Sequence, residues 1–408
     1  MAASGESGHR AGWRDCTTKI AMVAACPYPA RRGTPIRIQR LAEGMAARGH
    51  QVHVVTYHYG SSDPGPALSV HRIPQIKSYQ NLSPGPTYVK LALLDPLLTL
   101  KLWQVLRRHQ VDVIHAHHFE GLLVAAAARL RRQIPLVFDA HTLLTSELPF
   151  YPLRLPRWVT NRIAGSFDRR LPGMADHVIT VTERIRQRLL RFGRVPEERV
   201  SVVPNGVECD LFSDSRNRAA KTANGRPTLI FTGNLAPYQG IDLMLLALRK
   251  VLNRRSDVQL KIVTDSSFEQ YDALARELGV SGSIELVRAQ FEDIPMLLAG
   301  ATVAVNPRTA CDGIPVKLLN YMAAGKPVLS FAGSAPGVCH QQTGWLVPDG
   351  DVDGFAEGAL TLLSNTELAS ALGQNARRLV QDKHDWSRSA ELTEDIYHRV
   401  IRERATQK

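Results

Sequence analysis

The apolar positions of the chain fall into short runs that alternate with longer amphipathic segments. Runs such as 19–25, 111–116 and 228–232 are rich in apolar and β-branched residues, which is typical of strands buried on both faces. The segment 34–49, which follows the first run, repeats its apolar residues with helical spacing. Because strand and helix alternate almost throughout, we expect an α/β fold whose parallel sheets are covered by helices on both faces.

A polar, aperiodic stretch at 213–226 interrupts this rhythm, and a second strand–helix series follows it. The pattern predicts two doubly wound, Rossmann-like domains. In chain order, we expect a disordered tail (1–17), an N-terminal domain (18–208), a linker (209–226), a C-terminal domain (227–385) and a terminal helix that packs back on the N-terminal domain (386–408). Ligands of such folds bind at the carboxyl ends of the strands, so the two domains would face each other across an active-site cleft.

The chain has 408 residues, with 50 Lys and Arg against 38 Asp and Glu, and its net charge is +12 at pH 7. Such a surplus favours an anionic partner. Clusters of basic residues at 129–132 and 184–194 occur without a zinc-finger pattern or an RNA-binding aromatic signature. We therefore expect the anionic partner to be a membrane surface and not a nucleic acid. An amphipathic helix at 88–109, broken near Pro96, is expected to pack on the core, with a membrane-facing role as the alternative.

No apolar run approaches the ~20 residues that span a bilayer, and the polar N-terminus lacks the apolar core of a secretory signal. The five cysteines are scattered without CxxC spacing, which argues against a disulfide scaffold and suits a reducing compartment. We therefore expect a cytoplasmic protein, with a peripheral position at the inner face of the plasma membrane as one option.

Three neighbouring histidines, His115, His117 and His118, raise the question of a metal site. Strand alternation places His115 and His117 on one face, but no third ligand follows at a recognised spacing, so we expect no metal. His115 is expected to be an interior, hydrogen-bonded residue, and the other two are expected near the carboxyl end of the strand. The chain also lacks the GxGxxG and GxxxxGK[ST] motifs, which argues against nicotinamide enzymes and P-loop NTPases.

The most specific stretch is 312–328, which predicts a loop, a helix that begins near Pro315, a glycine stop at Gly325 and a strand. Lys317 and Asn320 are three residues apart and share one face near the start of that helix. A helix N-terminus carries about half a positive charge and suits a diphosphate, to which Lys317 adds a full charge. The alternative is a solvated lysine on a surface helix.

This stretch resembles the hallmark of the family-4 retaining glycosyltransferases (glycosyltransferase group 1), which have the two-domain GT-B fold. In that family an acidic residue is followed, after seven positions, by a glutamate and a small-residue helix that ends in Gly-x-Pro-Val. Further matches occur in the family's order at 48–52, 111–117, 202–207, 231–240 and 343–347. The resemblance implies transfer of a hexose or hexosamine from a nucleotide-diphosphate sugar, bound by the C-terminal domain, to an acceptor hydroxyl held by the N-terminal domain, in polysaccharide or glycolipid biosynthesis of the cell envelope.

The chain departs from the family pattern at four donor-facing positions: Asn234 for arginine, Gln239 for lysine, Asn320 for glutamate and Asp312 for the longer glutamate. Fewer charge-assisted contacts to the donor diphosphate then remain, and such contacts are roughly twice as strong as neutral ones. We therefore expect Lys317 to take over this role, with Arg308 and Arg288 as helpers.

The resemblance also implies roles for individual positions. The catalytic residues would be Asp312, His141 and His117, none of them a covalent nucleophile. The donor-binding residues would be Gly33, Gly233, Asn234, Gln239, Gly313, Ile314, Lys317 and Asn320. The acceptor would contact His118 and Glu147, and no cofactor would be needed besides the donor itself.

Other interpretations stay open at this point. A non-catalytic, glycosyltransferase-like partner protein is favoured by the neutral side chains at 234, 239 and 320. A sugar-nucleotide epimerase of the GT-B type uses the same architecture. A phosphorylase does too, but it would need a cofactor lysine and a much longer chain.

Overall fold

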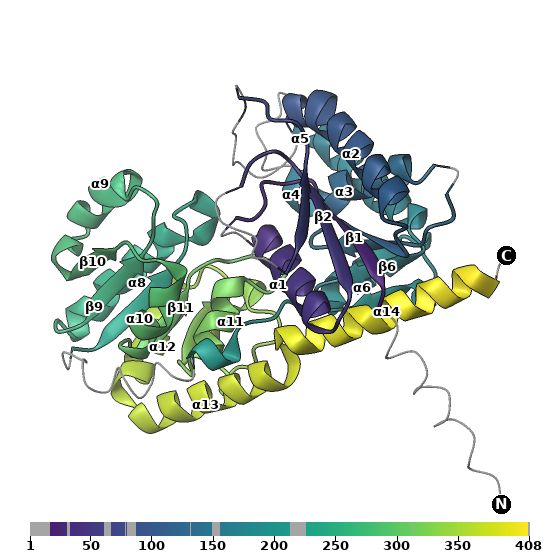
Figure 1. The fold of residues 1–408 in the computed structure, drawn as a ribbon. Coiled ribbons are helices and arrows are strands. Elements are labelled where there is room, and N and C mark those ends of the chain that lie inside the picture. Colours follow the sequence, from purple (N-terminus) through teal and green to yellow (C-terminus); the bar gives the residue numbers. More distant parts are fainter. Residues whose placement is uncertain are drawn as a thin grey trace, which may run out of the picture. The chain divides into compact units, whose positions relative to one another are not determined.

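The structure is a computed structural model that describes residues 17–30, 33–60, 67–77, 79, 87–130, 132–148, 156–212, 226–311 and 313–406. The chain divides into two compact units (Figure 1). Unit 1 consists of Met1–Pro204 and Trp386–Lys408, and unit 2 of Asn205–Asp385. Asp312 lies outside the described residues, as do residues 1–16 of the predicted tail 1–17 and residues 213–225 of the predicted linker 209–226.

Unit 1 is built on a seven-stranded sheet with the order β3-β2-β1-β4-β5-β6-β7, in which every pairing is parallel. Its strands are β1 (Lys19–Ala24), β2 (Gln51–Thr56), β3 (Ser69–Arg72), β4 (Val113–His117), β5 (Leu136–Ala140), β6 (His177–Thr180) and β7 (Val200–Val202). Its helices are α1 (Gly33–Ala47), α2 (Asp95–Arg108), α3 (His118–Ala128), α4 (Leu144–Glu147), α5 (Arg157–Arg170), α6 (Glu183–Arg191) and α14 (Trp386–Thr406), with short turns η1 (Lys90–Leu94), η3 (Leu171–Met174) and η4 (Glu197–Arg199).

Helices cover both faces of this sheet because successive side chains of a strand point to opposite faces. In β1, Ala21 and Val23 lie in one core cluster with residues of α2 and α3. Ile20 and Met22 lie in a second cluster with residues of α1 and α14. The continuous apolar run at 19–25 is therefore a strand buried on both faces, as its composition predicts.

Unit 2 repeats the plan with a six-stranded parallel sheet of order β10-β9-β8-β11-β12-β13. Its strands are β8 (Thr228–Thr232), β9 (Gln259–Val263), β10 (Ile284–Val287), β11 (Val303–Asn306), β12 (Val328–Phe331) and β13 (Trp345–Val347). Its helices are α8 (Ile241–Arg254), α9 (Glu269–Glu277), α10 (Ile294–Ala299), α11 (Val316–Ala323), α12 (Val352–Ser364) and α13 (Thr366–Lys383), with 3-10 turns η5 (Pro237–Gln239), η6 (Ser281–Ser283), η7 (Phe291–Asp293) and η8 (Ala332–Ser334).

These two parallel, Rossmann-like sheets confirm the predicted fold class. In each sheet the strand order reverses beside the first strand, between β1 and β4 in unit 1 and between β8 and β11 in unit 2. Ligands of such folds bind at the carboxyl ends of the strands next to the reversal. The loops that follow these strands are therefore the places to look for functional side chains.

The predicted helix 88–109 changes its winding near Pro96 rather than breaking there. Residues Lys90–Leu94 form a π-helical turn, and α2 continues directly from Asp95. Pro96 lies in the first turn of α2, where its missing N–H and fixed φ are tolerated.

The last helix, α14, completes the core of unit 1. Glu394 accepts hydrogen bonds from the Arg48 guanidinium, and its other oxygen lies 2.7 Å from His50 Nε2. Tyr397 is buried, and its hydroxyl lies 2.6 Å from His115 Nδ1. Side chains from the last part of the chain thus satisfy polar groups in the first part.

We expect the substitution Glu394→Gln to destabilise unit 1. Hydrogen bonds to charged groups contribute about 1.5–3 kcal/mol, and the neutral amide weakens those to Arg48 and His50. Urea unfolding of the full chain measures the loss. Glu391→Gln is the matched control, because its ion pair with Arg388 is exposed and its removal should change the free energy of unfolding by under about 0.5 kcal/mol. Equal stability of the two variants would contradict the prediction.

Candidate functional site

Lys317 lies in the first turn of α11 in unit 2. Pro315 precedes this helix with φ −58°, a value that the proline ring fixes and that suits a helix start. Lys317 Nζ donates a hydrogen bond to Gln239 Oε1 at 2.7 Å and lies 4.1 Å from the centre of the Phe231 ring. The ammonium group is therefore held in place by side chains, and Lys317 is not a freely solvated lysine on a surface helix.

The surroundings of Lys317 destabilise the protonated, positively charged form of its amine. Burial of the ammonium group and the nearby Arg308 cation lower the pKa of Lys317 to about 7. An anion bound next to Nζ reverses this balance, because its charge stabilises the protonated amine. Lys317 is thus a side chain whose charged form is best stabilised by a bound anion.

The turn after β8 joins two of the predicted donor residues to Lys317. Gly233 begins this turn with φ +130°, a conformation that favours glycine. Asn234 Oδ1 accepts a hydrogen bond from Gln239 Nε2 at 3.2 Å, and Gln239 in turn accepts the bond from Lys317. The three side chains form one hydrogen-bonded chain that ends in a cation.

Asn320 lies one turn further along α11 and is 7% exposed. Its Oδ1 is buried and has no hydrogen-bond partner among the described residues. A buried acceptor without a donor is unfavourable, so a ligand hydroxyl that donates to it would stabilise the site. Gly313 and Ile314 lie in the loop that leads into α11.

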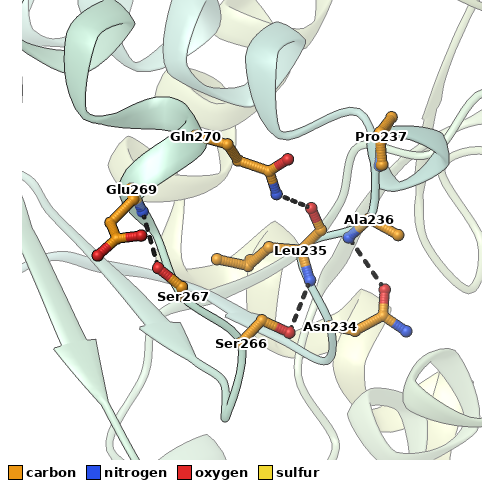
Figure 2. A pocket seen from close by; sticks show the side chains of 8 residues that line it. All are labelled: Asn234, Leu235, Ala236, Pro237, Ser266, Ser267, Glu269 and Gln270. Carbon is orange, nitrogen blue, oxygen red and sulfur yellow. Dashed lines mark hydrogen bonds between the residues drawn. The ribbon is translucent and has the colours of Figure 1, made fainter.

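A pocket lies beside the same turn in unit 2 (Figure 2). It is lined by the turn after β8 and by the segment after β9, which are joined by hydrogen bonds from Gln270 Nε2 to Leu235 O at 2.6 Å and from Leu235 N to Ser266 Oγ at 3.3 Å. The sequence analysis named Asn234 in this pocket but missed the lining residues Ser266, Ser267, Glu269 and Gln270. The available signal was their position, directly after the carboxyl end of a buried strand.

In unit 1 a buried ion pair lies at the carboxyl end of β5. Asp139 is completely buried, and its Oδ2 lies 2.8 Å from Arg37 Nε of α1. Arg37 is 1% exposed and also donates to the carbonyl oxygens of Val203 and Pro204, at 3.0 and 3.1 Å. The sequence analysis gave neither Arg37 nor Asp139 a role. The missed signal was an arginine in the buried stripe of an amphipathic helix, where a charge requires a partner.

Asp139 is a shared partner for three histidines. His115 Nε2 and His117 Nδ1 each lie 3.5 Å from its Oδ2, and His141 Nε2 lies 3.8 Å from it. Burial by itself raises the pKa of the Asp139 carboxyl, but Arg37 and the imidazoles outweigh burial and hold that pKa well below its usual range. Asp139 is therefore an ionised group that can orient the imidazoles around it.

Most of the predicted residues of unit 1 meet next to this carboxylate. His117 Nδ1 and His141 Nε2 are 3.1 Å apart, and the rings of His118 and His141 stack with their centres 4.7 Å apart. His118 Nε2 lies 2.8 Å from Thr34 Oγ1, and Thr34 follows Gly33 at the start of α1. Topology thus brings Gly33, His117, His118 and His141 together.

Burial keeps the central imidazoles neutral. It lowers the pKa of His117 to about 3 and that of His141 well below its usual value, because the charged forms are poorly solvated there. A neutral imidazole offers one donor and one acceptor, which suits the orientation of sugar hydroxyls. His115 is fully buried against Tyr397, as expected for an interior histidine, and Glu147 ends α4 with a side chain outside the described part.

His115, His117 and Asp139 lie close enough to one another to hold a metal ion. Arg37, however, already binds both oxygens of Asp139, at 2.8 and 3.3 Å. A buried guanidinium in contact with the carboxylate repels a second cation, so these residues fit an ion pair better than a metal site.

Solved structures place the fold among the GT-B proteins. Sucrose-phosphate synthase from Thermosynechococcus elongatus matches with a TM-score of 0.76 and 20% identity, covering 94% of this chain and 99% of that chain. HepE of Anabaena, solved in complex with UDP and glucose, matches with a TM-score of 0.71 and 20% identity, covering 93% and 99%. The class of fold that this chain shares with them is the two-domain GT-B fold.

Two family matches cover most of the chain. Residues 31–211 match Glycosyltransferase Family 4, and residues 226–365 match Glycosyl transferases group 1. The D-inositol 3-phosphate glycosyltransferase of Saccharomonospora viridis is 26% identical over 395 residues, which cover 90% of this chain and 89% of that protein. The chain belongs to this glycosyltransferase family, as the stretch 312–328 predicts.

The neutral buried histidines predict a fold that loses stability in acid. Below the ordinary histidine pKa of about 6.5 the unfolded chain binds a proton that folded His117 does not bind until about pH 3. The free energy of unfolding therefore falls as the pH drops, by up to about 1.4 kcal/mol per pH unit for each such histidine.

We expect His117→Gln to reduce this slope between pH 6 and pH 4, as measured by urea unfolding at stepped pH. His340→Gln, at an exposed position in unit 2, is the control and should leave the slope unchanged. If the free energy of unfolding of His117→Gln fell with pH as steeply as that of the parent protein, His117 would be protonated in the folded protein over this pH range.

Proposed function

We propose that this glycosyltransferase uses a nucleotide-diphosphate sugar as donor and transfers its hexose or hexosamine, with retention of anomeric configuration, to an acceptor hydroxyl. The observation that carries the proposal is the position of Lys317, which lies at the N-terminus of α11 and against the turn after β8. A helix N-terminus with an adjacent lysine is suited to a diphosphate. The similar fold of HepE, which was solved with UDP and glucose, supports this donor class.

Lys317 would stabilise the leaving group. With a pKa of about 7, its amine is partly neutral at physiological pH, and the arriving diphosphate would draw it into the charged form. Negative charge grows on the diphosphate as the glycosidic bond breaks, so the contact would strengthen in the transition state. We therefore propose that the transfer step uses no metal and no cofactor, because Lys317 and the helix N-terminus supply the positive charge.

The remaining donor contacts follow the same logic. Asn320 would accept a hydrogen bond from a ribose hydroxyl through its unpartnered Oδ1. Gly33, Gly233 and Gly313 have no side chain and would let the backbone approach the donor closely. Ile314, next to Gly313 in the loop before α11, would also contact the donor.

The sugar would be oriented by side chains of unit 1 and by the acidic residue of the hallmark. His117 Nδ1 lies beside Asp139 and His141, and its Nε2, buried and without a partner among the described residues, would accept a hydrogen bond from a sugar hydroxyl. His141 and Asp312 would position the transferred sugar, and His118 and Glu147 the acceptor. The acceptor would attack from the side of the departing phosphate, so no covalent nucleophile is needed.

A donor panel tests the proposal directly. Purified protein is incubated with several nucleotide sugars, and released nucleoside diphosphate and the anomeric configuration of the product are measured. Release with one donor and an α-linked product from an α-linked donor support retention. Interconversion of the donor sugar without an acceptor would indicate an epimerase. Binding without turnover of any donor would indicate a non-catalytic partner protein, which the neutral Asn234, Gln239 and Asn320 favour.

We further propose that the protein works in polysaccharide or glycolipid synthesis of the cell envelope, on the cytoplasmic side of an anionic membrane. The support is a stripe on η1 and α2 where Leu93, Leu100 and Trp103 are 43, 51 and 39% exposed. The stripe ends at Arg107, whose guanidinium lies 4.7 Å from the Trp103 ring. Apolar and aromatic side chains with basic neighbours suit a lipid surface.

The basic clusters seen in the sequence fit a membrane surface less well than this stripe. Arg129 binds Asp176, and Arg186 binds Glu183 and Glu197, so the charges of these two arginines are balanced within unit 1. Among the described residues, no helix is both long and apolar enough to cross a bilayer. Contact with lipid would therefore be at the surface.

We expect Lys317→Ala to lower kcat/KM for the donor about 30- to 1000-fold, which corresponds to about 2–4 kcal/mol of lost transition-state stabilisation. Gln239→Lys in this background should restore part of the rate, because position 239 already contacts Lys317 Nζ. Lys261→Ala, which removes a lysine paired with Glu285, is the control and should keep the parental rate. Parental turnover by a folded Lys317→Ala enzyme would refute the assigned role and point to Arg308 instead.

We expect Leu100→Ser combined with Trp103→Ser to weaken co-sedimentation with anionic vesicles. Binding of the parent should also decrease at high salt, because screening acts over about 8 Å at physiological ionic strength. Leu286→Ser changes a residue of unit 2 that is 52% exposed and should have no effect. Parental binding by the double variant, or no binding of the parent at low salt, would contradict the membrane proposal.

A further inference from the structure

Three further histidines meet in unit 1, and none of them belongs to the group around Asp139. His53 lies in β2, His71 in β3, and His109 directly follows α2. His53 Nδ1 and His71 Nε2 are 3.1 Å apart, and the rings of His53 and His109 have their centres 4.2 Å apart. One nitrogen from each ring lies within 4.8 Å of the other two.

The fold explains why residues so far apart in sequence converge. β2 and β3 pair in parallel with His53 opposite Ser69, so His71 is the diagonal neighbour of His53 on the same face of the sheet. The helix α2 packs against both strands, and His109 directly follows its last residue, Arg108. The end of this helix therefore places His109 beside the other two histidines.

The three side chains are largely shielded from solvent: His53 is 7% exposed, and His71 and His109 are half-buried. The Nδ1 atom of His53 faces His71 Nε2, so these are the two nitrogens that an ion between the rings would bind.

We propose that His53, His71 and His109 bind one divalent transition-metal ion of the Zn²⁺ class, with a water molecule as fourth ligand. Tetrahedral Zn²⁺ with Zn–N bonds of about 2.0–2.1 Å requires nitrogens roughly 3.3 Å apart. The facing nitrogens of His53 and His71 are 3.1 Å apart, and one nitrogen of His109 lies within 4.8 Å of a nitrogen of each of the other two rings.

The charges around the cluster indicate which ions it prefers. Lys19 lies close enough to His53, and Lys101 and Arg108 close enough to His71, for their charges to repel a bound dication. Affinity must then come from the nitrogen–metal bonds themselves. That favours ions that prefer imidazole, such as Zn²⁺, over Mg²⁺ or Ca²⁺, which prefer oxygen ligands.

The ion would stabilise the fold rather than take part in sugar transfer. It would link β2, the four-residue edge strand β3 and the end of α2. The cluster lies on β2, on β3 and directly after α2, whereas His117 lies at the end of β4. Metal binding to the folded state alone raises the free energy of unfolding.

The test uses the full chain without a polyhistidine tag. Zn²⁺ is titrated by calorimetry, the zinc-induced shift in thermal unfolding is recorded, and Co²⁺ provides a visible spectrum that reports tetrahedral geometry. We expect one ion per chain, a raised unfolding temperature and a tetrahedral Co²⁺ spectrum. His71→Gln and His109→Gln, at half-buried positions, should each weaken binding at least about tenfold.

Two variants control for other histidines. His340→Gln removes an exposed imidazole and should bind Zn²⁺ as the parent does. His117→Gln tests the second histidine cluster and should also bind as the parent does. Absence of Zn²⁺ binding by the parent, parental affinity in His109→Gln, or loss of binding in His117→Gln would each overturn the proposal.

Discussion

Parallel hydrogen bonding between strands is the constraint on which both units depend. Because every strand of a parallel sheet runs in the same direction, the carboxyl ends of all strands meet at one edge. In unit 1 this edge gathers His117 and Asp139 from two different strands, together with His141 just beyond. In unit 2 it brings the turn after β8 to the first turn of α11, where Gln239 meets Lys317. The polar groups of each unit are thus assembled by topology.

The ion pair between Arg37 and Asp139 then fixes how these groups behave. A buried ion pair contributes little net stability, because both charges lose their hydration. Its main effect here is on the histidines: a carboxylate that stays ionised holds the N–H groups of neighbouring imidazoles toward itself. In unit 2 the polarity is reversed, since Lys317 forms no ion pair with a carboxylate among the described residues, and a bound anion would stabilise its charged form. Unit 1 therefore offers imidazoles suited to hydroxyl groups, and unit 2 offers an amine suited to phosphates.

The elements and the family were predictable from the sequence because both depend on local signals. Apolar runs gave the strands, and the stretch 312–328 located the helix start, Lys317 and Asn320. The missed features are contacts over long separations in sequence. Arg37 and Asp139 are 102 residues apart, and Arg48 and Glu394 are 346 apart. Periodicity shows that such a side chain is buried but not which residue it meets. The pocket segment 266–270 was missed for a related reason, since polar residues after a strand resemble any loop.

The return of α14 to unit 1 has a consequence for biosynthesis. Unit 2 is one uninterrupted segment, and its ends are joined by the pairing of Val207 with Asp385 and by a 2.8 Å hydrogen bond from Val207 N to His384 O. Unit 1 needs Glu394 and Tyr397, which are synthesised after the whole of unit 2. Domains generally fold in the order of their synthesis, N-terminal first. In this chain the second unit has all its residues before the first does, so nascent unit 1 lacks the α14 partners of Arg48, His50 and His115 until that helix has been synthesised.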